Sequence, residues 1–292
     1  MDNPEVKLVV LLLLSGVAWS ATGGGGGGQT SASFNNNYEI TWGYDHVLLL
    51  NGGAEVQLSF DASSGSGFAS KLSYGSGLIS ISMKLSNKAY TGGLVTTLFM
   101  SSNTNNHDEL DIEILGHDIG QPYTIQTNIF VNGVGGREQR ITPWFDPSTD
   151  FHTYSILWNL RQVVFSIDNT PIRVFKNNQN IGVPYLTQPM QIITSLWNGD
   201  TWATDGGRSK MNYAYAPFDV QFEGFGINGC PVYNNDIQSC YSSQYWWNSP
   251  NYWQLSSTQQ SAYDNVKRNY MNYNYCTDRS RYPTPPPECA TQ

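Results

Sequence analysis

Residues 109–114, with the sequence ELDIEI, alternate acidic and aliphatic side chains with a period of two. This period is typical of a β-strand, because successive side chains of a strand point to opposite faces of the sheet. The aliphatic face, which we expect to pack in an apolar core, carries Leu110, Ile112 and Ile114. The acidic face carries Glu109, Asp111 and Glu113. The segment therefore predicts a strand that presents three carboxylates side by side.

Between residues 34 and 225, short β-rich runs alternate with turn signals such as NGG at 51–53 and NG at 132–133. The runs at 163–167 and 172–175, joined through DNTP at 168–171, predict a β-hairpin. Such a density of short strands is typical of a two-sheet antiparallel sandwich. The fold class that we expect is therefore all-β.

One segment near the C-terminus has a helical period instead. Its apolar positions are Tyr263, Val266, Tyr270 and Met271. Ser256 and Gln259 have the spacing of a capping box, which is typical of a helix N-terminus. We therefore expect one helix of about three to four turns that covers a face of the sheet.

The N-terminus has the pattern of an export signal. Lys7 precedes an apolar run at 8–14, and small residues follow around Ala18. The run is too short to span a bilayer. We expect a signal peptide at 1–20, a Gly-rich flexible segment at 21–33, a β-rich domain at 34–225 and a C-terminal extension at 226–292. The mature protein is then soluble and secreted.

All four cysteines lie in the C-terminal extension: Cys230, Cys240, Cys276 and Cys289. An even number of cysteines in an exported protein indicates two disulfides. Three connectivities are possible, of which local pairing, Cys230 with Cys240 and Cys276 with Cys289, is the simplest. A Cys₄ zinc site calls for closer pairs of cysteines, so disulfides are favoured.

The composition of the chain indicates which classes of molecule it can bind. Charged residues and aromatic residues each make up 13% of the chain, and the net charge is −8 at pH 7. A negative protein is a poor partner for nucleic acid or for an anionic polysaccharide, because like charges repel. A neutral glycan faces no such barrier, and aromatic rings suit it.

The acidic face of residues 109–113 calls for a chemical explanation, because three like charges repel and Asp and Glu are poor strand formers. A solvated edge strand and a calcium or magnesium site are the alternatives. The α-carbons of Glu109 and Glu113 lie about 13 Å apart on a strand, and inward-leaning side chains bring the carboxyl groups to about 5–5.5 Å. That is the separation found in retaining glycosidases. Asp111 between them would separate their pKa values, which favours a nucleophile and a general acid/base.

The motif HDELDIE at 107–113 resembles the catalytic motif of the plant xyloglucan endotransglucosylase/hydrolases, in glycoside hydrolase family 16. The resemblance covers nearly the whole mature chain. It continues through QTN at 126–128, REQR at 137–140, WFDP at 144–147 and WN at 197–198. The segments NYCTD at 274–278 and PPEC at 286–289 resemble the extension that sets this family apart from its bacterial relatives.

The resemblance implies a curved antiparallel β-jelly-roll sandwich of the concanavalin-like type, catalytic at 34–225, with a substrate cleft across its concave face. It implies that Glu109 is the nucleophile, that Glu113 is the acid/base and that Asp111 supports them. Local pairing of the cysteines also matches the family. The implied sugar-binding positions are Gln126, Thr127, Asn128, Gly136, Arg137, Glu138, Arg140, Trp202, Ala203, Gly207 and Arg281.

The chain departs from the family pattern at four places. Ile112 and Ile114 stand where the family usually has Phe, and Phe99 stands where it usually has Tyr. Gly136 replaces the usual Asp, which puts one ligand contact in doubt. GHD at 116–118 stands in place of a glycosylation sequon, and no such sequon occurs anywhere in the chain.

For several side chains a structural role competes with the functional one. Trp197 and Trp202 are either stacking platforms for sugar rings or ordinary core. Arg137 and Arg140 bind sugar or lie on the surface, and His107 and His152 are expected to be structural partners. The aromatic run at 245–247 either extends the acceptor site or packs in a C-terminal layer.

The function that the resemblance implies is cleavage of the β-1,4-glucan backbone of xyloglucan with retention, followed by transfer of the new end to another xyloglucan chain. We expect a monomer in the cell wall and extracellular space (apoplast), with xyloglucan as donor and xyloglucan or an oligosaccharide as acceptor. No cofactor, metal, nucleic acid or membrane is expected. A mainly hydrolytic xyloglucan endo-glucanase and a non-catalytic glycan-binding lectin remain as alternatives. The segment 172–178 resembles members that mainly transfer, whereas 204–207 and 212–218 resemble the group that includes hydrolases.

Overall fold

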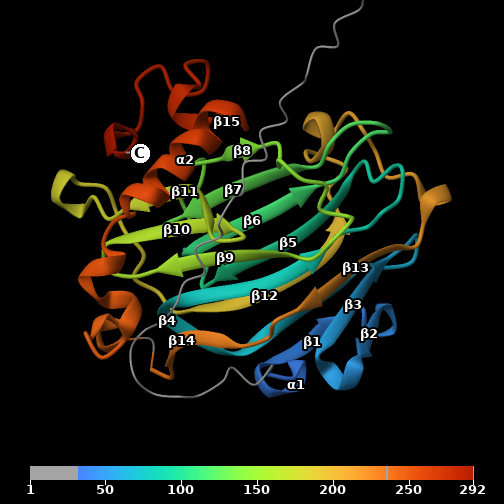
Figure 1. The fold of residues 1–292 in the computed structure, drawn as a ribbon, viewed down its shortest axis with the longest axis horizontal. Coiled ribbons are helices and arrows are strands. Elements are labelled where there is room, and N and C mark those ends of the chain that lie inside the picture. The colour runs from blue at the N-terminus through green and yellow to red at the C-terminus, as the bar shows by residue number, and fades with distance from the viewer. Residues whose placement is uncertain (1–31, 235, 292) are drawn as a thin grey trace, which may run out of the picture. The chain divides into compact units, whose positions relative to one another are not determined.

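The computed structural model describes residues 32–234 and 236–291 (Figure 1). The expected signal peptide and the Gly-rich segment up to residue 31 lie outside the described residues. Strands dominate the described ranges, and their one long helix lies near the C-terminus, as the sequence predicts. Among these residues, none of the helices has the length and apolar character that a membrane crossing requires.

The described residues form one antiparallel network of 15 strands. The strands are β1 (Tyr38–Trp42), β2 (Val47–Leu50), β3 (Glu55–Phe60), β4 (Ser66–Lys84), β5 (Leu94–Ser101), β6 (Glu109–Leu115), β7 (Thr124–Phe130), β8 (Gln139–Ile141), β9 (His152–Trp158), β10 (Gln162–Ile167), β11 (Thr170–Lys176), β12 (Met190–Asn198), β13 (Phe218–Glu223), β14 (Ile227–Val232) and β15 (Met271–Asn274). The α-helices are α1 (Phe34–Asn37) and α2 (Ser257–Asn269). Short 3₁₀ helices are found at Tyr44–His46, Asn51–Gly53, Gln179–Ile181, Thr204–Gly207, Tyr213–Tyr215, Gln238–Tyr241, Trp246–Asn248, Pro250–Tyr252, Tyr275–Thr277 and Pro287–Thr291.

Strand β4, which is 19 residues long, belongs to two layers of the sandwich. Up to Ser70 it pairs with β1 on one edge, and up to Tyr74 it pairs with β12 on the other. It pairs with β14 from Ser73 and with β9 from Gly77, and its end pairs with β13. One layer therefore runs in the order β1, β4, β12, β5, β6, β7, β8, β15, and the other contains β11, β10, β9 and the second half of β4. The predicted antiparallel sandwich is confirmed.

The aliphatic face of β6 lies in the core between these layers. Leu110 and Ile112 are 0% exposed and Ile114 is 1% exposed. They belong to one apolar cluster with side chains of the opposite layer, among them Ile156 and Phe165. The period of two in residues 109–114 therefore predicts correctly which side chains point inward. Burial of this face fixes the register of β6, because a slip by one residue would exchange its two faces.

The predicted hairpin consists of β10 and β11, which pair in antiparallel fashion. Its turn is shorter than expected, because Thr170 and Pro171 already belong to β11. Asp168 and Asn169 form the turn with φ values of 48° and 64°. Two successive residues with positive φ are typical of the hairpin turns whose twist matches that of the strands, and Asn and Asp tolerate this conformation.

Helix α2 begins as the capping box predicts. The Ser256 hydroxyl accepts a hydrogen bond from the backbone N–H of Gln259, and the Gln259 side chain accepts one from the Ser256 N–H. Tyr263 and Val266 are the buried residues of the helix, and they face β11. The predicted helix over the sheet is therefore confirmed, but it ends earlier than expected: Tyr270 is its C-cap and Met271 already belongs to β15.

The C-terminal extension is held by the two local disulfides, Cys230–Cys240 and Cys276–Cys289, as the sequence predicts. Its strand β15 pairs with β8 and lengthens the layer that contains β6 (Figure 1). Trp247 is 4% exposed and donates from Nε1 to Oγ of Ser76 at 2.9 Å. Trp247, with Tyr245 packed against it, therefore belongs to a C-terminal layer, the second of the two interpretations given above, whereas Trp246 is 39% exposed.

Candidate active site

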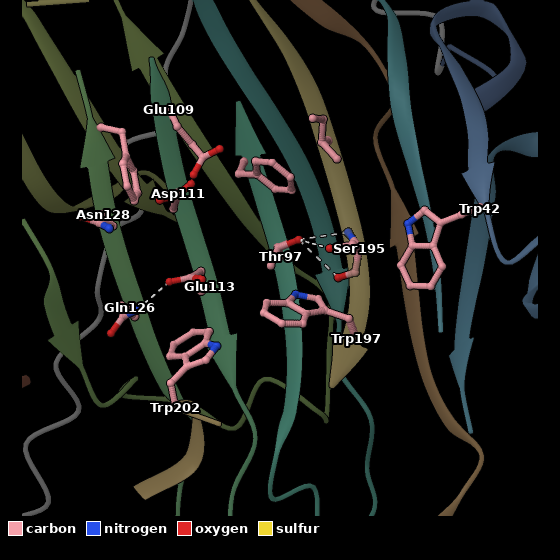
Figure 2. A pocket seen from close by; sticks show the side chains of 13 residues that line it. Trp42, Thr97, Glu109, Asp111, Glu113, Gln126, Asn128, Ser195, Trp197 and Trp202 are labelled. Carbon is pink, nitrogen blue, oxygen red and sulfur yellow. Dashed lines mark hydrogen bonds between the residues drawn. The ribbon is translucent and has the colours of Figure 1, made fainter. Parts of the chain in front are cut away.

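The acidic face of β6 lines an open cleft of about 620 Å³ (Figure 2). The walls and floor of the cleft come from β5, β6, β7 and β12, with one side chain from β1 and one from the loop after β12. The lining residues are Trp42, Thr97, Phe99, Glu109, Asp111, Glu113, Gln126, Asn128, Phe130, Ile193, Ser195, Trp197 and Trp202. All three carboxylates of β6 therefore share one accessible face.

Strand register gives each carboxylate a neighbour on either side. Asp111 and Glu113 each have one neighbour on β5 and one on β7, because β6 pairs with both strands over its whole length. The two rows are Phe99, Asp111, Asn128 and Thr97, Glu113, Gln126. Glu109 is paired with Phe130 on the β7 side. The regular register keeps the carboxylates on rigid strands, which is how a catalytic geometry is held.

Glu113 is arranged to carry a proton near neutral pH. Its pKa is raised to about 7, chiefly by burial; the hydrogen bond from Gln126 opposes this rise, and the nearby charge of Glu109 adds to it. That bond runs from Nε2 of Gln126 to Oε2 of Glu113 at 2.6 Å. A carboxyl group with a pKa near the working pH can both give and take a proton, as a general acid/base must.

Asp111 lies between the two glutamates and is only 6% exposed. Burial raises its pKa well above the ordinary value, and the charges of Glu109 and Glu113 raise it further, while the guanidinium of Arg173 lowers it. In Figure 2 the carboxyl groups of Glu109 and Asp111 lie next to each other. A neutral Asp111 adds no third negative charge to this face, so the repulsion expected among three carboxylates is reduced.

Gln126 is oriented by a second residue. Nε of Arg140 donates to Oε1 of Gln126 at 2.6 Å, which leaves the amide NH₂ directed at Glu113. The Arg140 guanidinium lies over the ring of Tyr273, 5.4 Å from its centroid. Because Tyr273 belongs to β15, the C-terminal extension contributes to the positioning of the catalytic carboxylates.

Trp197 and Trp202 both line the cleft, with ring centroids 6.1 Å apart and planes inclined by 41°. They are partly exposed, and their buried sides pack on Val95, Leu115 and Ala203. Ala203, which the resemblance places among the sugar-binding positions, is 1% exposed and lies beneath the two indoles. The rings are thus held from below and present surface to the cleft, as stacking platforms require.

The side chain of Thr127 does not reach the cleft. Thr127 is paired with Ile112 of the aliphatic face and alternates with Gln126 and Asn128, which line the cleft. Its hydroxyl accepts from NH1 of the buried Arg173 at 3.0 Å. The sugar contact expected for this side chain is therefore not supported, because the period of two turns it to the core face.

Arg137 is likewise an interior residue, 9% exposed. Its Nε donates to Oε1 of Glu288 at 2.8 Å and its NH1 donates to the carbonyl of Val134 at 2.6 Å. A sugar contact by the Arg137 side chain is not supported, because Glu288 of the C-terminal extension accepts from Nε and the backbone carbonyls of Ile129 and Val134 accept from NH1. Glu138 and Arg281 form an ion pair at 2.6 Å, so these two predicted positions do come together.

Gly136 and Gly207 do not line the cleft. Gly136 has a φ of 82°, and a Cβ there would lie 2.6 Å from the hydroxyl oxygen of Tyr282. That hydroxyl donates to the Gly136 carbonyl at 2.8 Å. The conformation and the close approach explain why Gly replaces the usual Asp here. Gly207 ends the 3₁₀ helix Thr204–Gly207 behind Trp202.

His107 and His152 have structural partners in the fold, as expected. His152 interacts through Nδ1 with Asp168 at 2.6 Å, and its ring stacks on Phe145. Nε2 of His107 lies 3.9 Å from Oε2 of Glu109, and its ring contacts Phe130. His107 therefore borders the site without lining the cleft.

Seven residues that line the cleft are not among the expected sugar-binding positions: Trp42, Thr97, Phe99, Phe130, Ile193, Ser195 and Trp197. Thr97 and Ser195 face each other across β5 and β12, with their hydroxyl oxygens 2.7 Å apart. The register of β5 against β6 places Thr97 beside Glu113, so pairing information would have identified it. Trp42 has no such signal in the sequence, because its orientation depends on an irregularity in β1 that is described below.

The chain matches two family models over most of its described length. The model described as Glycosyl hydrolases family 16 matches residues 34–215, and the one described as Xyloglucan endo-transglycosylase (XET) C-terminus matches residues 241–289. Xyloglucan endotransglucosylase/hydrolase protein 2 of Arabidopsis thaliana is 54% identical over 258 residues, which are 88% of each chain.

Two solved structures are similar to the fold. A β-glucanase of Bacillus licheniformis superposes with a TM-score of 0.51 at 23% identity, covering 64% of this chain and 89% of the glucanase. A Crh5 transglycosylase superposes with a TM-score of 0.55 at 24% identity, covering 68% of this chain and 81% of the other. These likenesses concern the fold alone, and they agree with the predicted antiparallel β-jelly-roll.

Proposed function

The chain belongs to glycosyl hydrolase family 16, among the xyloglucan endotransglucosylase/hydrolases, and on this premise we propose that it cleaves the β-1,4-glucan backbone of xyloglucan and transfers the new end to another xyloglucan chain. The observation that supports the proposal best is the protonatable Glu113, which shares the acidic face of β6 with Glu109 in an open cleft.

In the first step, a carboxylate oxygen of Glu109 attacks the anomeric carbon of the bound glucan. The bond from that carbon to the linking oxygen breaks, and Glu113 gives its proton to the departing oxygen. The product is a glycosyl ester of Glu109 and a free chain end. The Gln126 amide, held by Arg140, is positioned to stabilise the Glu113 carboxylate as it forms.

In the second step, Glu113 takes the proton from the 4-hydroxyl of an acceptor chain. The acceptor oxygen forms the new bond to the anomeric carbon as the bond to Glu109 breaks, so two displacements restore the original configuration. The pKa of Asp111 between the glutamates is raised by burial, which favours its protonated form and so a lower negative charge on this face. Each proton and electron pair therefore has a donor and an acceptor on this face.

Transfer requires that an aligned sugar outcompetes water for the glycosyl ester. The cleft extends to both sides of β6, from Gln126 and Asn128 on β7 to Ser195 on β12 and beyond. Such a floor offers contacts to sugar rings on both sides of the linkage that breaks. We therefore favour transfer over hydrolysis, with xyloglucan as donor and xyloglucan or an oligosaccharide as acceptor.

The proposal includes the place of action. The family premise and the N-terminal export pattern support a secreted protein that acts in the cell wall and the extracellular space (apoplast). The proposal also includes that it acts as a monomer.

The test is a product assay with xyloglucan and a fluorescently labelled xyloglucan oligosaccharide. Transfer predicts that label appears in polymer, and Glu109→Ala should lower the rate at least about a thousandfold. Glu223→Ala, a change of an exposed glutamate at the end of β13, should leave the rate unchanged. Label that stays in small sugars while the polymer shortens would identify a hydrolase. Tight binding of xyloglucan without turnover would identify the lectin.

A further inference from the structure

Strand β1 contains an irregularity that redirects its last side chain. Tyr38 and Ile40 are paired with Ser70 and Phe68 of β4 and pack toward the main core. By strict alternation, Trp42 would follow them to the same side. The register shifts after Ile40, however, and two residues of β1 then stand opposite one residue of β4. A bulge of this kind reverses the alternation, and it turns the indole of Trp42 into the cleft.

Two glycines make room for this indole: Gly67 of the paired strand β4 and Gly65 just before that strand. A Cβ on Gly67 would lie 2.4 Å from Nε1 of Trp42, and a Cβ on Gly65 would lie 3.0 Å from its Cη2. Both distances are shorter than side-chain atoms normally allow, so the ring lies directly on backbone that has no side chains. Gly67 is paired with Ser195, which lines the cleft, so the glycine surface continues the cleft floor.

Trp42 lies far from the reacting carboxylates. The order of strands from the catalytic strand is β6, β5, β12, β4, β1, which is four strand spacings or about 19 Å. Figure 2 shows Trp42 at the side of the cleft opposite to Gln126 and Asn128. The side chain therefore contacts neither the linkage that breaks nor the acid/base, and any contact with substrate is to sugar rings several positions away along the chain.

The exposed surface of Trp42 has the chemistry of a sugar platform. The side chain is 38% exposed, although it is large and apolar. Its Nε1 donates no hydrogen bond within residues 32–234 and 236–291, so it is available to a hydroxyl group. We propose that Trp42 stacks on a sugar ring of the glucan at the β1 end of the cleft, and that it determines how strongly long chains are preferred over short ones. This inference rests on the function proposed above.

The experiment compares substrates of increasing backbone length. Transfer to a labelled acceptor is measured with xyloglucan polymer and with a series of xyloglucan oligosaccharides, for the wild type and for Trp42→Ala. Loss of one stacked ring should lower kcat/KM for the polymer by about three- to tenfold. The shortest oligosaccharide that is still cleaved should lose a smaller factor, because it does not reach β1. Trp42→Phe should restore most of the preference for long chains.

Two further variants separate stacking from folding. Gly67→Ala would push the indole off its glycine surface and should weaken the preference for long chains while Trp42 is retained. Trp253→Ala removes a tryptophan of similar exposure, 45%, that lies outside the cleft against Arg161. It should leave the preference unchanged. An equal loss for short and long substrates in Trp42→Ala, or no loss for the polymer, would overturn the inference.

The experiment distinguishes a failure of the proposed function from a failure of the inference about Trp42. A wild-type protein without turnover on xyloglucan would contradict that function, whatever Trp42 does. In that case, binding of the same oligosaccharides to the Glu109→Ala protein, measured by calorimetry, still tests whether Trp42 stacks on a sugar ring. Weaker binding of long oligosaccharides after Trp42→Ala would support it, and unchanged binding would refute it.

Discussion

Arg137 donates from Nε to Oε1 of Glu288 at 2.8 Å, although 151 positions of sequence separate the two residues. Both side chains are buried, with Arg137 9% exposed and Glu288 3% exposed. Glu288 lies in the final 3₁₀ helix, Pro287–Thr291, and the next residue is Cys289 of the second disulfide. This pair therefore attaches the end of the chain to the segment that follows β7, next to the catalytic strands.

Breaking the pair at one partner should destabilise the fold. Arg137→Met leaves the Glu288 carboxylate buried without its cation, and we expect it to lower the free energy of unfolding by about 3–5 kcal/mol. The double variant Arg137→Met with Glu288→Leu should recover much of that loss, because no buried charge remains. Urea denaturation measures the free energy of unfolding of both variants. Arg208→Met, which breaks an exposed pair with Asp205, is the control and should unfold like the wild type. A single variant as stable as the control would contradict the assignment.

Activity should fall as pH rises through about 7. The first step requires protonated Glu113, whose pKa is raised to about 7 by burial. Below that pH the acid is available, and above it the carboxyl group loses its proton and cannot protonate the departing oxygen. The dependence of kcat/KM on pH should therefore show a basic limb near pH 7. A rate that stays constant up to pH 9 would argue against Glu113 as the acid.

Gln126→Leu should move this basic limb to higher pH. The amide donates to the Glu113 carboxylate and so stabilises the ionised form, which lowers the pKa of Glu113. Removing the donor favours the protonated form, and the limb shifts upward. Gln221→Leu on β13, which does not line the cleft, should not move the limb. A downward shift in Gln126→Leu would show that the hydrogen bond has the opposite effect.

Sequence patterns predicted the elements whose two faces differ in chemistry. The alternation in residues 109–114 places Ile112 in the core and Asp111 in the cleft, and the capping box of Ser256 marks the start of α2. These features are local, since the residues that determine them are a few positions apart. The disulfide pairing is local too, and it was predicted correctly.

Positions transferred by motif were less informative, because a motif does not state which face a side chain takes. The run at 126–128 places Gln126 and Asn128 in the cleft and Thr127 in the core. Arg137 is occupied by Glu288, a partner from the other end of the chain that no local pattern indicates. Trp42 enters the cleft through a register shift, which depends on the pairing of β1 with β4. These outcomes depend on contacts between distant segments.

Ile112→Phe should destabilise this chain although the family usually has Phe at that position. Ile112 is 0% exposed and has Leu98 and Thr127 as its cross-strand neighbours. A larger ring in this filled space forces neighbouring side chains to move, and such overpacking typically costs about 1–3 kcal/mol. Thermal unfolding would detect the change, with Ile112→Leu as a control of nearly equal volume. A variant with an unchanged or higher Tm would show that space is available behind β6.

Removal of the second disulfide should loosen the end of the chain. Cys276 and Cys289 close a loop with a sequence separation of 13, and the double variant Cys276→Ala with Cys289→Ala should lose about 2–4 kcal/mol of stability. Because Glu288 is adjacent, the Arg137 pair should weaken as well. Limited proteolysis followed by mass spectrometry should then detect cleavage within 277–291, which the wild type should resist. Equal resistance in both proteins would contradict this view.

Strand β4 has a consequence for how the molecule loses its structure. It contributes hydrogen bonds to both layers, so its departure would leave unpaired strand edges in the two layers at once. Neither layer can open widely while the other stays intact, because both depend on the same 19 residues. Backbone amides of β12 and of β9 should therefore exchange with solvent deuterium through one shared global opening, as a single cooperative unit.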